Sequence, residues 1–169
     1  VLRGPPGCYD SSFDGADAGM LSDVRMLLAR VAAPTALHLD RVGTTLTADV
    51  VDAIVSKAGP SLTSLTVTDT KVDDETAAAL AIGLPRLKTL RFDDVTDDGV
   101  AAFAAVCPDL THLDVPDLYG SVSDRSILEV ARHCPLLLHL NVSCNDGCIT
   151  DEGMQAVIAC CPHLQSLNV

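Results

Sequence analysis

One pattern occurs six times along this chain of 169 residues. Each copy has an apolar anchor residue, a segment with helical periodicity, a proline, and a short segment of strand-like character. The anchors are Leu21, Leu46, Val72, Val95, Val122 and Ile149, and they are separated by 25, 26, 23, 27 and 27 residues. A period of about 20–50 residues is typical of stacked repeat proteins. One such unit cannot bury its own apolar face, so the pattern predicts a solenoid in which neighbouring units cover one another.

Each repeat begins with a predicted helix that has one apolar face. Apolar residues recur 5, 8 and 12 positions after the anchor, offsets that keep side chains on one side of a helix. The three columns, which we expect to be buried, are Met26, Val51, Ala77, Val100, Ile127 and Met154; Ala29, Ile54, Leu80, Phe103, Val130 and Val157; and Ala33, Ala58, Leu84, Cys107, Cys134 and Cys161. Ser, Thr and Asp residues just after the anchors predict helix capping, and prolines end the helices.

A short strand follows each proline, with apolar and polar residues in alternation. The clearest runs cover residues 62–67, 87–92, 110–115, 137–142 and 164–169. Such alternation indicates one buried face. We therefore predict a right-handed α/β solenoid, or horseshoe, with a parallel sheet on the concave side and helices on the convex side. For the first strand two registers are open: one turns Ala36, Leu39 and Arg41 inward, and the other turns Leu37 and Leu39 inward.

The repeats divide the chain into two parts. Residues 20–169 are predicted to form the repeat domain, with about six repeats, as a piece of a longer array. Residues 1–19 do not fit the pattern: we interpret Val1 and Leu2 as the end of a preceding strand and the remainder as an irregular insertion between repeats.

Composition narrows the classes of partner. The net charge is −12, from 23 acidic and 11 basic residues, which argues against binding nucleic acid. No apolar run approaches the ~18 residues of a membrane span. Seven cysteines, most of them inside repeats, are a poor disulfide framework. We therefore expect a cytoplasmic protein without membrane contact, with the nucleus as the alternative.

The most regular repeat covers residues 149–167. It reads Ile-Thr-Asp-x-Gly, then Cys-Pro-x-Leu, then Leu, and its predecessor has Leu-x-x-Leu-x-Val before the loop. This motif resembles the cysteine-containing leucine-rich repeat (LRR), and the resemblance covers roughly residues 20–169. Ala33, Ala58 and Leu84 replace the cysteine in the early repeats. The subclass is similar to the substrate-binding arms of F-box/LRR ubiquitin ligases, and similar repeats occur in mitotic-exit regulators and in scaffold proteins of cilia and flagella.

Polar residues of the strands are the candidate partner-binding site. Parallel strands lie about 4.8 Å apart, so His112 and His139 should be neighbours, with Asp114 and Asn141 beside them. The candidate residues on the concave face are Arg91, His112, Asp114, His139, Asn141, Asp93, Thr66 and Asn168. An ordinary solvated surface and a His–His–Asp metal or acid/base site are the alternatives; an open sheet supplies neither a nucleophile nor oxyanion donors.

Other polar and sulfur-containing residues have simpler interpretations. Cys107, Cys134 and Cys161 are expected to be small buried residues, whereas Cys144 and Cys148 share one loop, for a structural role or for redox or metal chemistry. Acids after the strands, namely Asp69, Asp93, Asp94 and Asp117, form a rim that could face a basic partner. Tyr119 is either a contact residue or a cover for its own loop.

Together these features predict a protein–protein interaction scaffold that uses its concave LRR surface and is not an enzyme. We expect no catalytic residues, no cofactor and no metal, and a protein partner with a basic surface. A larger cytoskeletal, ciliary or flagellar assembly is one setting for such a scaffold. The alternative is the substrate-recognition arm of an F-box/LRR ligase of the SCF type.

Overall fold

Strands and helices alternate along the whole array. A computed structural model of the chain describes residues 2–3, 24, 26, 28, 30, 33–41, 45–116, 121–143 and 147–169. Its elements are β1 (Leu2–Arg3), β2 (Ala36–Asp40), α2 (Ala48–Ala58), β3 (Ser64–Thr68), α3 (Asp74–Gly83), β4 (Thr89–Phe92), α4 (Asp97–Val106), β5 (His112–Asp114), α5 (Asp124–His133), β6 (His139–Asn141), α6 (Asp151–Cys160) and β7 (Ser166–Asn168).

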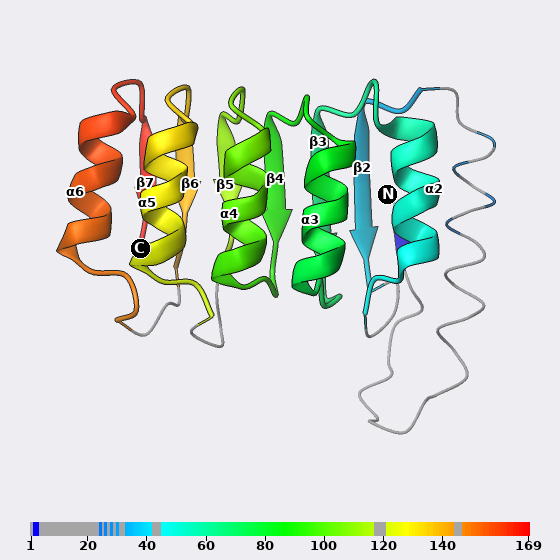
Figure 1. Ribbon diagram of the computed structural model, residues 1–169, viewed down its shortest axis with the longest axis horizontal. Helices are drawn as coiled ribbons and strands as arrows, with labels where there is room; N and C mark the ends of the chain where they lie inside the picture. Colours follow the sequence, from blue (N-terminus) through cyan, green and yellow to red (C-terminus); the bar gives the residue numbers. More distant parts are fainter. Residues whose placement is uncertain are drawn as a thin grey trace.

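The strands form one parallel sheet in the order β1-β2-β3-β4-β5-β6-β7. Figure 1 shows the helices side by side in one layer and the strands in a second layer behind them, with successive repeats following the long axis of the molecule. Each repeat therefore packs on the one before it and the one after it, which confirms the predicted α/β solenoid. Within the described ranges, no helix combines the length and the apolar character needed to cross a membrane.

The strand register aligns equivalent residues of successive repeats. Leu65, Leu90, Leu113 and Leu140 are paired across β3 to β6 and are at most 2% exposed. The residues on either side of each leucine are half-buried, and because side chains alternate along a strand they lie on the face opposite the buried leucines. This alternation is the one predicted for a strand with a single buried face.

The first complete strand adopts the second of the two registers left open. Leu37 is 9% exposed and Leu39 is fully buried, and they pair with Leu65 and Val67 of β3. Ala36 is exposed, and Arg41 follows the strand with a positive φ of 54° and an exposed side chain. The register with Ala36 and Arg41 inside is therefore wrong, because pairing with β3 fixes the alternation of β2.

Two of the described residues of the expected buried columns are exposed, and Ala29 lies outside the described residues. Met26 is 61% exposed, while Val24 and Leu28 are 2% and 3% exposed. Residues four apart share a helical face and the residue midway between them points to the other side, so the buried face of this first repeat differs from the prediction. Ala33 has a positive φ of 47° and is also exposed, because the chain turns there before β2.

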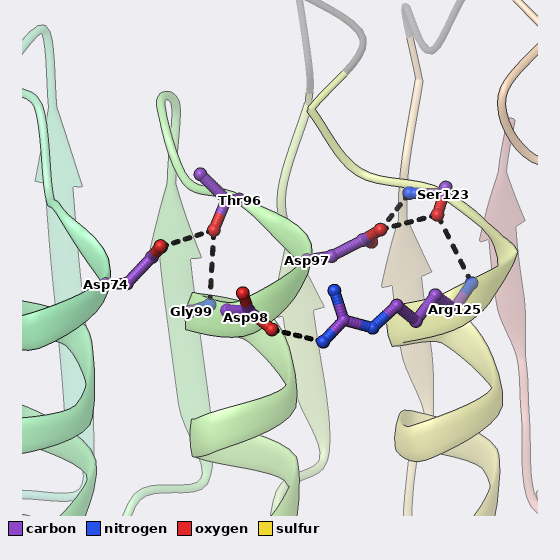
Figure 2. A network of polar contacts seen from close by, with 7 residues as sticks. All are labelled: Asp74, Thr96, Asp97, Asp98, Gly99, Ser123 and Arg125. Carbon is purple, nitrogen blue, oxygen red and sulfur yellow. Dashed lines mark hydrogen bonds and ion pairs between the residues drawn. The ribbon is translucent and has the colours of Figure 1, made fainter.

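Hydroxyl and carboxyl groups at the helix starts join neighbouring repeats (Figure 2). Thr96 donates its hydroxyl hydrogen to Asp74 of the preceding repeat and accepts from the N–H of Gly99 in its own helix. One repeat later, the N–H and the hydroxyl of Ser123 donate to Asp97 over 2.8 and 2.5 Å. The last copy has the same arrangement.

In that last copy, the N–H and the hydroxyl of Thr150 donate to Asp124 over 2.9 and 2.5 Å. A Cβ on Gly153 would lie 2.3 Å from the same carboxylate. Local capping is right for Thr96, Ser123 and Thr150, and for Asp73, which accepts from the N–H of Thr76 over 2.8 Å. Thr47 makes no side-chain capping bond, and Ser22 lies outside the described residues. Local capping is wrong for Asp97 and Asp124, the acids of two later repeats, which accept from the next repeat instead.

The cysteine column forms a second set of contacts between repeats. The thiol of Cys107 donates to the carbonyl of Leu84 over 3.5 Å, that of Cys134 to the carbonyl of Cys107 over 3.8 Å, and that of Cys161 to the carbonyl of Cys134 over 3.5 Å. All three are at most 2% exposed, as expected. Each thiol thus adds a second donor to a carbonyl at the helix end of the preceding repeat, which also accepts from a main-chain N–H three residues further along.

Candidate functional site

The strand face away from the helices, hereafter the open sheet face, carries a hollow of about 390 Å³. It is lined by the first three residues of β4, by all of β5 and β6, and by residues of β3 and β7. Seven of the eight candidate residues lie around it: Thr66, Arg91, His112, Asp114, His139, Asn141 and Asn168. Thr89 and Ser166 also line it, in the row of paired residues that contains His112 and His139, although they were not among the candidates.

A charged network occupies one column of this face. Arg91 of β4 forms an ion pair and hydrogen bond with Asp114 of β5, and Asn141 of β6 donates to the other oxygen of that carboxylate over 2.6 Å. Arg91 Nη2 also lies 3.0 Å from Asp93 Oδ1, an ion pair outside hydrogen-bond geometry. The oxygen of the Asn141 amide accepts from the N–H of Ser143. These contacts hold the three strands' side chains in fixed positions.

Asp93, the eighth candidate, lies at the end of this network. Burial raises the pKa of its carboxyl group above the usual value, although the positive charge of Arg91 opposes the rise. Asp93 is therefore better explained as an internal partner of Arg91 than as a rim charge reserved for another protein.

Two histidines occupy the neighbouring column. His112 and His139 are directly paired across β5 and β6, and their rings stack with centroids 4.3 Å apart and an interplanar angle of 26°. Burial, together with the neighbouring His139, lowers the pKa of His112. Nδ1 of His112 lies 2.9 Å from the hydroxyl of Thr111. The predicted adjacency of the two rings is thus observed in the structure.

Two of the four rim acids have basic partners inside the chain: Asp69 lies 3.6 Å from Arg41, and Asp93 is paired with Arg91. Asp117 and Tyr119 lie outside the described residues, as do Cys8 and Cys144. Cys160 is an exposed free thiol, and Cys148 is also exposed.

The metal alternative has no support in the part of the chain that the structure describes. There, no group of three or more His, Cys, Asp or Glu side chains is arranged to hold a metal ion. Burial raises the pKa of Cys107 to about 11 and that of Cys134 to about 12, so these thiols resist the ionisation that metal binding requires.

Comparison with known proteins agrees with this architecture. A family model described as "Leucine Rich repeat" matches residues 133–157. A structure titled leiomodin-1 actin-binding site 2 is similar over 89% of this chain and 90% of that one, with 16% identity and a TM-score of 0.56. A search of curated proteins gives no significant match.

A second solved structure is similar to this chain over a smaller share of its own length. It is a chain of the Rad7 and Elc1 complex in yeast, with 24% identity over 63% of this chain and a TM-score of 0.52. The match spans 27% of the length of that yeast chain. At these identities the likenesses show the fold.

The fold, the repeat motif and the family match together define the class of protein. It is an α/β solenoid of the leucine-rich-repeat class. The chain has the leucine-rich-repeat fold, and its later repeats carry Cys107, Cys134 and Cys161 at their helix ends, as the cysteine-containing repeat motif does.

Proposed function

We propose that this chain is a non-enzymatic protein-interaction scaffold and that its partner binds the open sheet face. One observation supports this most directly: the hollow is lined by seven predicted side chains from five successive strands. Side-chain contacts hold several of these residues in place, so little conformational entropy would be lost when a partner binds. Leucine-rich repeats and the two similar structures agree with binding to another protein.

An affinity capture with full-length protein tests this function. The variant Arg91→Ala, His112→Ala, His139→Ala removes the centre of the site. A matched control, Arg132→Ala, His133→Ala, His163→Ala, removes the same residue types from exposed positions outside it. We expect the first variant to lose partners that the wild type and the control retain. Equal recovery by all three proteins would show that the open sheet face is not the binding site.

The narrower alternative is the substrate arm of an F-box/LRR ubiquitin ligase. Its support is the resemblance of the cysteine-containing repeats to that subclass. An F-box of about 40 residues elsewhere in the full-length protein, together with co-purification of a cullin, would favour the ligase over a cytoskeletal or ciliary scaffold. We propose the cytoplasm as the site of action, with the nucleus and the cilium as alternatives that fluorescence imaging of the full-length protein distinguishes.

A further inference from the structure

The hydrogen bonds around Thr111 determine the tautomer of His112. The hydroxyl of Thr111 lies 2.9 Å from the carbonyl oxygen of Lys88 and 2.9 Å from Nδ1 of His112. Both contacts are hydrogen bonds only if the single hydroxyl hydrogen is directed to Lys88, because a carbonyl oxygen can only accept; that carbonyl also accepts from the N–H groups of Thr111 and His112. The hydroxyl oxygen then accepts from His112, which places the proton of the neutral ring on Nδ1.

The other ring nitrogen of His112 is consequently a hydrogen-bond acceptor. In a neutral imidazole with the proton on Nδ1, Nε2 carries a lone pair and no hydrogen. Within the described ranges no side chain or backbone group donates to this atom, and the ring lines the hollow. Stacking on His139 holds the plane of the ring. The hollow therefore presents an oriented acceptor to whatever enters it.

The charge balance of the hollow is also suited to a donor. Of the residues that line the hollow, Arg91 and Asp114 balance each other; Asp93, which pairs with Arg91 outside the lining, leaves the network with a net charge of −1 while the histidines are neutral. The chain as a whole has a net charge of −12. Each oxygen of Asp114 accepts one hydrogen bond, from Arg91 or from Asn141, and a carboxylate oxygen has room for a second.

We propose that the hollow receives a lysine or arginine side chain of the partner protein, with Nε2 of His112 and the carboxylate of Asp114 as its acceptors. This inference rests on the proposed function and specifies the chemistry of the partner. His112 and Asp114 are two positions apart on β5, so their Cα atoms are about 6.6 Å apart on the same face. One guanidinium, with donors on both of its sides, can bridge acceptors at that spacing.

Acidification should remove such a contact. Protonation of His112 places a hydrogen on Nε2, and it also adds a positive charge beside those of Arg91 and the incoming residue. The titratable groups that face His112 are His139 on β6 and the Arg91–Asp114 pair on β4 and β5. Because burial and His139 lower the pKa of His112, the acceptor form persists somewhat below the usual histidine range.

A selection from a random short-peptide display library, carried out on the repeat protein itself, tests the proposal. Peptides are selected on the wild type and re-measured on His112→Phe, which keeps an aromatic ring for stacking but has no Nε2, and on Asp114→Asn. Controls with matched changes are His163→Phe and Asp109→Asn, both at exposed positions outside the hollow. The Asp109 control accounts for non-specific attraction of basic peptides to an acidic protein.

We expect enrichment of peptides with a required Lys or Arg. Each test variant should weaken their binding about tenfold or more, as for loss of a charged hydrogen bond, and the controls should leave it unchanged. Binding should also weaken as the pH falls through the pKa of His112. Peptides that are sensitive to the test variants but need no basic residue would overturn this inference and leave the proposed function intact. Peptides that are insensitive to the test variants, or the absence of any bound peptide, would count against both.

Discussion

Cys134 and Cys160 provide a comparison at the scale of single residues. Cys134 is fully buried and its thiol pKa is raised to about 12 by burial, whereas Cys160 is exposed. Alkylation requires the thiolate and access to it. We therefore expect iodoacetamide to modify Cys160 in the native protein and to modify Cys134 only after unfolding, as measured by peptide mass spectrometry. Equal labelling rates for the two cysteines in the native state would contradict the buried position of Cys134.

At the residue scale, burial could be predicted only where the repeat pattern is regular. The burial of Cys107, Cys134 and Cys161 follows from their position in the helical column. Their hydrogen bonds to carbonyls of the preceding repeat do not, because the sequence pattern contains no information on the distance between a thiol and a neighbouring main chain. Met26 and Ala33 were predicted wrongly for a related reason: an offset counted from the anchor assumes that every repeat has the same helical phase.

At the scale of elements, the first turn of α4 contains two adjacent carboxylates with different roles. Asp97 accepts two hydrogen bonds from Ser123, while Asp98 is 55% exposed and forms an ion pair with Arg125, itself 67% exposed (Figure 2). We expect Asp97→Ala to lower the free energy of unfolding by about 1–3 kcal/mol, and Asp98→Ala to lower it by about 0–1 kcal/mol. Urea denaturation of the two variants measures the difference, and equal losses would contradict the bridging role of Asp97.

The pH dependence of this difference follows from the pKa of Asp97. Burial raises that pKa, but hydrogen bonds from Ser123 and the nearby Ser126 outweigh the burial, so it lies below the ordinary value of 3.8. A carboxyl whose pKa is lower in the folded state stabilises the fold above its unfolded pKa. The stability advantage of the wild type over Asp97→Ala should therefore be complete near neutral pH and shrink as the pH falls through the folded pKa.

Elements were predictable where the pattern is regular and uncertain where it is not. The strands from β3 to β7 and the helices from α2 to α6 follow from apolar spacing, capping residues and prolines. For β2, spacing alone left two registers, and pairing with β3 decided between them. The bridging role of Asp97 and Asp124 is visible only after stacking, because each partner belongs to the following repeat.

At the scale of the whole molecule, stacking creates the candidate site from residues far apart in the sequence. Thr66 and Asn168 are separated by 102 positions (168 minus 66), yet both line one hollow. The repeat register predicted this grouping, since equivalent residues of neighbouring strands must be adjacent. It could not predict that Arg91 would be neutralised by two carboxylates, or that Thr111 would fix the tautomer of His112, because both depend on side-chain conformation.

The central claim is that partners bind the open sheet face, and site-specific photo-crosslinking tests it most directly. A photoreactive amino acid is placed either at Thr89, beside the hollow, or at Ile82, which is 73% exposed on helix α3. The full-length protein is then irradiated in cell extract and its adducts are compared by mass spectrometry. We predict protein adducts from position 89 that are absent or much weaker from position 82. Adducts from position 82 alone would place the partner on the helix face and contradict the claim.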